Sequence, residues 1–160
     1  MRINEIHNYS FGITSAIMTS LAVIIGLSWA TNNLTIIATL LIIAIADNVS
    51  DSFGMHVYQE SKNISSKEVK KTTTNNFIAR ILTTLVFILF VIILSTNLAV
   101  IISTIFGLTV LVIISYFISL NRNINPYYMT SRHLALAIIL MVSSFVLRYV
   151  ILTIFSSFIK

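Results

Sequence analysis

Five long apolar segments dominate this sequence and limit what it can fold into. They cover approximately residues 11–30, 34–58, 77–95, 98–120 and 134–158, and each is near or above the ~20 residues that a helix needs to cross a bilayer. Apolar residues make up 57% of the chain and charged residues 9%, whereas soluble domains contain roughly 45–50% and about 25%. Backbone amides that face lipid must be satisfied within the segment, which favours helices. The sequence therefore predicts an all-α polytopic membrane protein, with one five-helix domain over residues 1–160.

Basic residues are confined to alternate connections between these segments. The connections at 31–33 and 96–97 carry none. The leader and the connections at 59–76 and 121–133 contain Arg2, Lys62, Lys67, Lys70, Lys71, Arg122 and Arg132. Because loops rich in Lys and Arg remain in the cytoplasm, we expect a cytoplasmic N-terminus and a C-terminus outside. We expect an integral protein of a prokaryotic cytoplasmic membrane that binds no nucleic acid, since its net charge of +5 is explained by these loops.

Other local features give further expectations about the helices. The two very short connections predict tight hairpins between the first and second helices and between the third and fourth. Pro126 is the only proline and is expected to end the fourth helix or its extension. Arg80, near the start of the third helix, is expected to anchor that helix at the inner interface. Gly107 predicts close packing of the fourth helix against a neighbour.

The stretch Ala44–Ser61 places polar residues inside the second membrane helix. At about 100° per residue, one arc of roughly 140° contains several of them. These residues are Asp47, Asn48, Asp51, Ser52 and Met55, and His56 and Glu60 extend the same side toward the cytoplasm. Carboxylates within a membrane helix are costly and usually functional. The array therefore predicts a functional polar face on this helix.

The chemistry of this face favours a divalent cation. Two carboxylates one helical turn apart offer hard oxygen ligands, and Asn48 and Ser52 add neutral oxygens. Met55 and His56 add softer donors, which favours Fe(II) or Mn(II) over Mg²⁺. We expect the metal ligands to be Asp47, Asp51, Met55, His56 and Glu60. On the first helix, the supporting polar surface comprises Ser15, Met18 and Thr19. Carboxylates at this depth could also carry protons.

Arg148 is a second charge within the membrane segments. By helical rise it lies about 10 Å from the depth of Asp47. It is therefore expected either to extend toward the outer headgroups or to act as a charge partner of Asp47.

The five-helix layout and two local motifs resemble the vacuolar iron transporter (VIT-like) family. In the first segment, FGITSAIMTSLAVIIGLSWA matches the family pattern at Gly12, Gly26 and Leu27. In the second, ADNVSDSFGMHVYQES matches at Ser52 and Tyr58. The chain departs from the family where Ser15 replaces an Asp of the first helix, Ala16 a Gly, Phe53 a Met and Val57 a Glu of the second helix. The family's large charged insert is reduced to residues 59–76. The resemblance implies a homodimer with an ion path between the first two helices of both protomers.

Together these features predict a homodimeric divalent metal transporter that exports Fe(II) or Mn(II) from the cytosol in exchange for protons. The transported metal would be its only inorganic partner, with no resident cofactor. The alternative is a non-transporting membrane subunit or assembly module whose polar second helix is a buried helix–helix interface. A third hypothesis is an intramembrane enzyme that holds Mg²⁺ against a lipid pyrophosphate. Because the longer acidic signatures of the CDP-alcohol phosphotransferases and prenyltransferases are missing, we do not expect an enzyme.

Overall fold

The computed structural model describes residues 3–29 and 31–155, and its regular structure there consists of five helices. They are α1 (Ile3–Leu27), α2 (Asn33–Ser61), α3 (Ser66–Ile93), α4 (Thr96–Asn121) and α5 (Pro126–Phe155). Each contains a stretch that is long and apolar enough to cross a membrane. The predicted all-α architecture with five membrane-spanning helices is therefore confirmed for the described residues, while the orientation of the termini stays a prediction.

Several helices begin earlier than hydropathy alone predicted. α3 begins at Ser66, where the side chain of Ser65 caps the backbone N–H of Glu68. Helix formation depends on capping and local propensity, so it continues through polar residues that hydropathy excludes. α5 begins at Pro126, whereas α4 ends at Asn121. The expectation that Pro126 ends a helix is wrong, because proline suits the first turn of a helix, where its missing N–H costs nothing.

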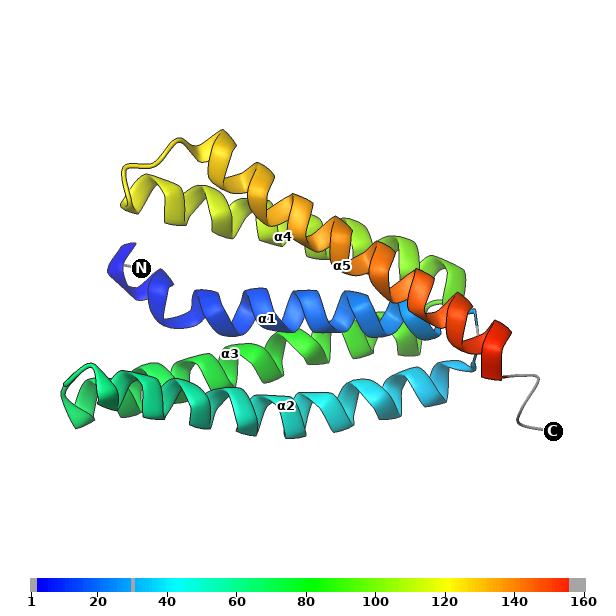
Figure 1. Cartoon of the computed structure of the whole chain (residues 1–160), viewed down its shortest axis with the longest axis horizontal. Coiled ribbons are helices and arrows are strands. Elements are labelled where there is room, and N and C mark those ends of the chain that lie inside the picture. The colour runs from blue at the N-terminus through cyan, green and yellow to red at the C-terminus, as the bar shows by residue number, and fades with distance from the viewer. Residues whose placement is uncertain (1–2, 30, 156–160) are drawn as a thin grey trace.

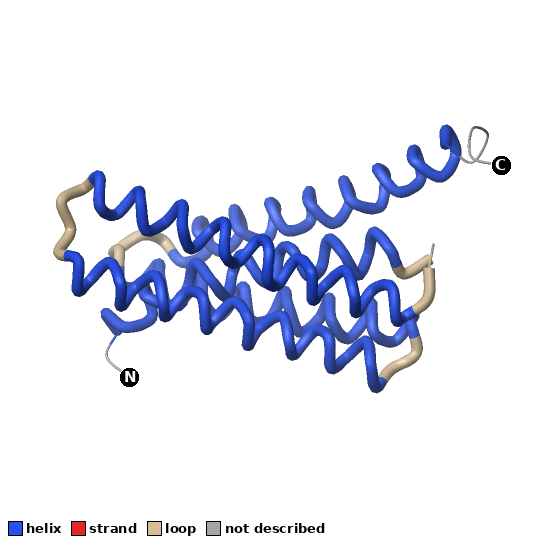
Figure 2. Tube along the Cα trace, turned by 90° about the horizontal axis from the view of Figure 1, so that it is seen from below, coloured by secondary structure: helices blue, strands red, loops and turns tan. Residues whose placement is uncertain are grey.

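The helices form an elongated bundle with α1 in the middle, between the α2–α3 pair and the α4–α5 pair (Figure 1). The start of α1, the α2–α3 connection and the α4–α5 connection share one end of the bundle. We call this the basic end, because those connections carry the basic residues. The two short connections lie at the other end, which we call the far end (Figure 2).

The tight hairpins predicted for α1–α2 and α3–α4 are not what the structure shows. α2 packs mainly along α3, and α4 packs mainly along α5, whereas the pairs joined by the shortest connections contact each other much less. A short turn fixes only the adjoining helix ends, and the complementary faces decide the rest of the packing. Asn33 connects the start of α2 to the end of α3 and the start of α4. Its Nδ2 donates to the Val91 carbonyl at 2.9 Å, and its Oδ1 accepts from the Thr96 hydroxyl at 2.6 Å.

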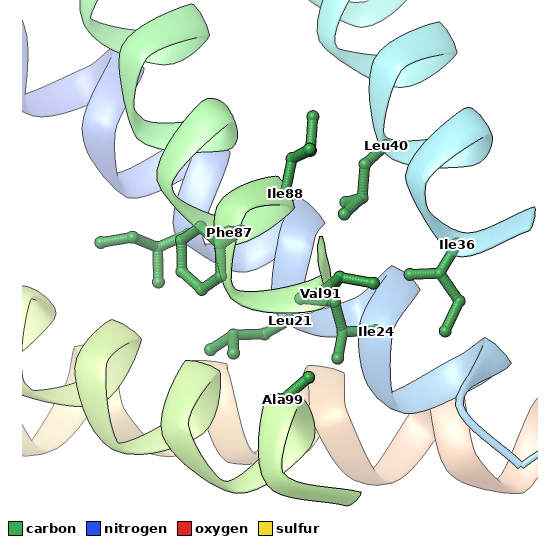
Figure 3. Close-up of a cluster of buried hydrophobic side chains, with 9 residues drawn as sticks. Leu21, Ile24, Ile36, Leu40, Phe87, Ile88, Val91 and Ala99 are labelled. Carbon is green, nitrogen blue, oxygen red and sulfur yellow. The ribbon is translucent and has the colours of Figure 1, made fainter. Parts of the chain in front are cut away.

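An apolar core joins α1, α2, α3 and the start of α4 in the half of the bundle nearer the far end (Figure 3). Phe87 is its largest buried side chain, and its ring stands edge-on to those of Phe90 and Phe106. Gly107 of α4 lies against this core, because a Cβ there would stand 3.0 Å from Leu21. The predicted close packing at Gly107 is therefore confirmed. The core consists of Ile17, Leu21, Ile24, Ile36, Leu40, Phe87, Ile88, Val91 and Ala99.

Candidate functional site

The polar side of α2 faces the interior of the bundle. Asn48 is 1% exposed, whereas Val49 and Phe53 on the other side of the helix are more than half exposed. The amide of Asn48 donates to the backbone carbonyl of Phe77 in α3 at 2.9 Å, and Ser52 Oγ donates to Asn48 Oδ1 at 3.4 Å. The predicted separation of a polar face from an apolar face is therefore seen in part: Asn48 is buried and Val49 and Phe53 are exposed, but the Asp47 and Asp51 side chains on the polar face are also 51% and 40% exposed.

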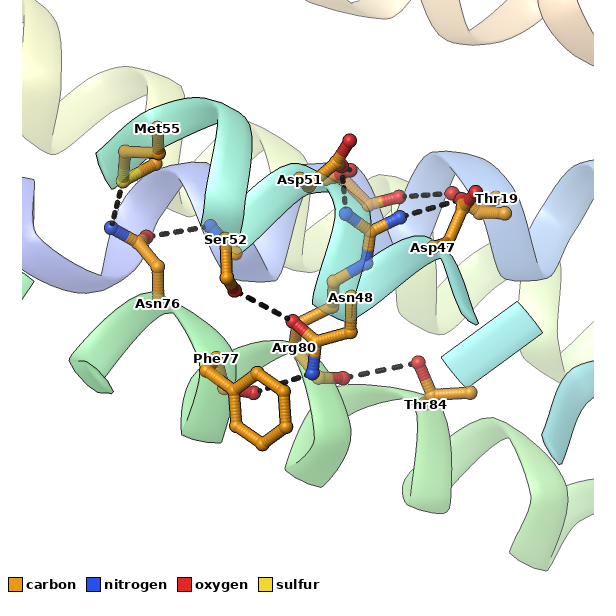
Figure 4. Close-up of polar contacts among 12 residues, drawn as sticks. Thr19, Asp47, Asn48, Asp51, Ser52, Met55, Asn76, Phe77, Arg80 and Thr84 are labelled. Carbon is orange, nitrogen blue, oxygen red and sulfur yellow. Dashed lines mark hydrogen bonds and ion pairs between the residues drawn. The ribbon is translucent and has the colours of Figure 1, made fainter. Parts of the chain in front are cut away.

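A buried arginine of α3 holds both carboxylates of this face (Figure 4). Arg80 Nη2 donates to Asp47 Oδ2 at 2.8 Å, and Nη1 donates to Asp51 Oδ2. The Arg80 side chain is only 4% exposed, while those of Asp47 and Asp51 are 51% and 40% exposed. We call these three residues the charged cluster. Two carboxylates and one guanidinium leave it with a formal charge of −1 when all are ionised.

Arg80 is therefore not the interfacial anchor that the sequence suggested. The position of Arg80 along α3 was the sequence signal that could have identified Asp47 as its partner. Asp47 lies 14 residues from the start of α2 at Asn33, and Arg80 lies 13 residues from the end of α3 at Ile93. Both helix ends are at the far end of the bundle, so each residue is about 20 Å from it at 1.5 Å per residue. An arginine and a carboxylate at equal depth on adjacent helices form a natural pair.

The suggested pairing of Arg148 with Asp47 is not formed, because Asp47 binds Arg80. The guanidinium of Arg148 lies 5.4 Å from the centre of the Phe145 ring. Its Nε and Nη1 are buried and have no hydrogen-bond partner within residues 3–29 and 31–155. Arg148 lines a hollow of about 440 Å³, the far hollow, together with residues of α1 and α2 that include Thr19 and Thr39.

Met55 and the α1 backbone both contact Asn76 of α3, which the sequence analysis did not single out. Asn76 Oδ1 accepts from the backbone N–H of Gly12 at 2.9 Å, and its Nδ2 donates to Met55 Sδ at 3.2 Å. A Cβ at Gly12 would stand 3.1 Å from the carbonyl carbon of Asn76 and still closer to its oxygen. Gly12 therefore permits the close approach of α1 to α3 that this contact requires. Its place in the first-helix motif was the only sequence signal for it.

The residues predicted to bind metal separate into three groups in the single chain. Asp47 and Asp51 bind Arg80, and Met55 accepts from Asn76. His56 Nε2 lies 3.2 Å from Glu60 Oε1, and this pair lies further along α2 toward the basic end than Asp47 and Asp51 do. Within the described part of the chain, no three His, Cys, Asp or Glu side chains are close enough together to hold a metal ion.

A hollow of about 730 Å³ opens between α1, α2 and α3 toward the basic end and reaches the charged cluster. We call it the basic-end hollow, and its walls include Phe11, Asp51, Met55 and Tyr58. From Asp51, polar contacts continue along α1 toward the far hollow. Ser15 Oγ donates to Asp51 Oδ2 at 3.4 Å, and Thr19 donates to the Ser15 carbonyl at 2.7 Å. Ser15 thus lies beside Asp51, Thr19 follows one turn along α1, and Met18 is half-buried on the same helix; a supporting role for these three residues stays a prediction.

No protein-family model, curated protein or solved structure matches this chain. The VIT-like resemblance therefore rests on the sequence motifs alone and stays a prediction. The structure gives one of the two matched glycines a packing role: Gly12 lies against Asn76, whereas a Cβ on Gly26 would make only an ordinary contact, 3.8 Å from Ser144 of α5.

Proposed function

We propose that this protein transports divalent metal cations, Fe(II) or Mn(II), across the membrane, exporting them from the cytosol in exchange for protons. The observation that carries the proposal is the charged cluster. Two half-exposed carboxylates lie one turn apart in α2, a helix long and apolar enough to cross a membrane, and one of them, Asp51, lines the hollow that opens toward the basic end. Carboxylates at such a depth attract cations and can also exchange protons.

Arg80 has a specific role in this proposal: it is the counter-ion that the protein itself supplies to the two carboxylates. Removing an ionised carboxylate from water costs several kcal/mol unless an opposite charge is close by. Arg80 contacts both carboxylates and compensates one of their two negative charges. It holds Oδ2 of each aspartate, so a cation that binds Asp47 and Asp51 would meet the positive charge of the guanidinium at the same pair of carboxylates. In this proposal, binding of the cargo and release of Arg80 are coupled, which gives the site two distinct states.

The hollows and polar side chains support a route between α1 and α2. His56 and Glu60 lie beyond Asp51 toward the end of α2, and in this proposal they form the cytoplasmic entry of the route. Beyond Asp51 and Asp47, the hydroxyls of Ser15 and Thr19 continue toward the far hollow. In a homodimer that pairs these helices, two charged clusters would share one route, and their summed formal charge of −2 matches one divalent cation.

Metal flux through proteoliposomes tests this proposal. The vesicles contain the purified protein and a metal-sensitive dye, and receive Fe(II), Mn(II), Zn(II) or Mg(II) outside. We expect Fe(II) or Mn(II) flux that falls at least tenfold in Asp47→Asn plus Asp51→Asn. Glu68→Gln makes the same chemical change at an exposed site in the first turn of α3 and should retain the flux. Equal flux in the double variant and the wild type would refute the proposal.

The second candidate is a non-transporting membrane subunit or assembly module. It is favoured by the way the polar groups satisfy one another within the chain: Arg80 compensates both carboxylates, and Asn48 and Asn76 bond to backbone groups. This candidate predicts stoichiometric co-purification with another membrane protein and no metal flux in any of the vesicles described above. Flux from the purified protein alone would exclude it.

A further inference from the structure

A basic hollow lies at the connection between α4 and α5, away from the charged cluster. It has a volume of about 230 Å³ and is lined by Arg122, Ile124, Tyr128, Met129, Arg132 and His133. At about 30 Å³ per water molecule, it has room for roughly seven waters, or for a small hydrated ligand group. Among the side chains that the structure describes, those of residues 9–29 and 31–154, neither guanidinium has a carboxylate within 4 Å. The lining residues of the hollow therefore bring two positive charges and no acid.

The surrounding structure fixes the backbone at Arg122 and the side chains of Arg132 and His133. The guanidinium of Arg132 lies 5.6 Å from the centre of the Tyr128 ring, which restricts its position through a cation–π contact. The backbone N–H of Arg122 caps α4, and the next residue, Asn123, turns the chain with φ of 52°. On the other wall, His133 Nδ1 lies 2.7 Å from Ser115 Oγ of α4. The hairpin therefore places two exposed arginines beside one hollow.

From this arrangement we propose that the hollow binds the phosphate of an anionic phospholipid from the leaflet at the basic end. Guanidinium groups bind phosphate oxygens in pairs, with both geometric fit and charge. The leaflet that faces Lys- and Arg-rich connections also contains the anionic lipids. The site lies at the membrane boundary, since it joins the end of one membrane-spanning helix to the start of the next.

Exposed apolar side chains at this hollow favour a lipid over a free phosphate. Ile124 and Tyr128 line the basic hollow, and they are 38% and 58% exposed. An apolar hollow of about 600 Å³ lies between the same two helices but on another face of α5, where Tyr127 and Leu134 line it. A phosphate site beside exposed apolar side chains is the combination that a headgroup with its acyl chain requires.

Native mass spectrometry and thermal unfolding of the full-length protein in neutral detergent test this inference. Phosphatidylglycerol, phosphatidylcholine and inorganic phosphate are titrated separately. We expect phosphatidylglycerol to bind at least tenfold more tightly than phosphatidylcholine and to raise the unfolding temperature. Arg122→Gln plus Arg132→Gln should remove this preference. The control Lys67→Gln plus Lys70→Gln removes two exposed positive charges at the same end of the bundle and should keep it.

Each other outcome overturns the proposal. Equal loss in the arginine and lysine variants would mean that general surface charge attracts the lipid. Stabilisation by inorganic phosphate as strong as that by phosphatidylglycerol would assign the hollow to free phosphate. No preference for phosphatidylglycerol in the wild type would mean that no such site exists. None of these readouts depends on metal flux, so this inference and the proposed transport can fail separately.

Discussion

The same three helices, α1, α2 and α3, pack together in two different ways along their length. Toward the far end they meet through the apolar core, where Ile36 and Leu40 of α2 contact α1 and α3. About 12–17 Å beyond Leu40 along α2, at 1.5 Å per residue, the contacts become polar at Asn48 and Asp51. Because lipid is as apolar as a leucine side chain, the apolar core is held by close fit more than by exclusion of water. The charged cluster depends instead on specific ion pairs, so a substitution at one of its three residues changes the environment of the others.

This contrast supports the place of the proposed function in the molecule. An apolar core can tolerate other combinations of side chains that conserve volume. A chain that needed only to pack its helices could continue the same chemistry through the half nearer the basic end. That half contains instead a buried arginine, two half-exposed carboxylates and an adjoining hollow. These features are costly for folding and suit a cation, so the proposed function is placed in that half.

The largest effect is expected from Arg80→Met, which removes the guanidinium and leaves two carboxylates without a counter-ion. Breaking a fully buried ion pair by removing one member costs about 3–5 kcal/mol, and because the two carboxylates are 51% and 40% exposed, the loss should lie toward the lower end of that range. We expect the unfolding temperature in detergent to fall sharply. Adding Asp47→Asn and Asp51→Asn to Arg80→Met should restore most of it. If the triple variant were no more stable than Arg80→Met alone, the effect would not arise from unpaired charge.

A comparable but different effect is expected from Phe87→Ala in the apolar core. Phe87 is fully buried, so its truncation leaves a cavity and costs about 3 kcal/mol. Unlike Arg80→Met, this loss should not be recovered by Asp47→Asn plus Asp51→Asn. In vesicles held well below its unfolding temperature, the variant should retain the metal selectivity of the wild type. Changed selectivity would show that the two halves are not separate in function.

A smaller effect is expected from Gly12→Ala at the edge of the charged cluster. The added Cβ would collide with the backbone of Asn76, and such overpacking typically costs about 1–3 kcal/mol. Gly54→Ala is the matched control, since a Cβ there would meet nothing within 4 Å. That control should be neutral or stabilising by about 0.5–1 kcal/mol, because alanine is a better helix former than glycine. Equal unfolding temperatures for the two variants would contradict the close approach of α1 to α3.

The sequence was sufficient for the helices and for which side of α2 is polar, because hydropathy and a 3.6-residue period decide both. It was not sufficient for the partner of each polar group. Arg80 lies only a few residues into an apolar run, and a position near a helix start resembles an interfacial anchor. Its pairing with Asp47 and Asp51 depends on α3 packing along α2. The short connections had instead suggested that α2 packs along α1 and α3 along α4. Likewise, the contact between Asn76 and Gly12 joins residues 64 positions apart in the chain, and no local pattern specifies it.

The central claim is that Arg80 and a divalent cation compete for the carboxylates of Asp47 and Asp51. Its most direct test is the Mn(II) affinity of the purified protein, followed by electron paramagnetic resonance in detergent. Three forms are compared: the wild type, Asp47→Asn plus Asp51→Asn, and Arg80→Gln. We expect binding in the wild type, no binding in the double aspartate variant, and at least tenfold tighter binding in folded Arg80→Gln, which lacks the competitor. Equal affinity in all three forms, or no Mn(II) binding in any of them, would contradict the account.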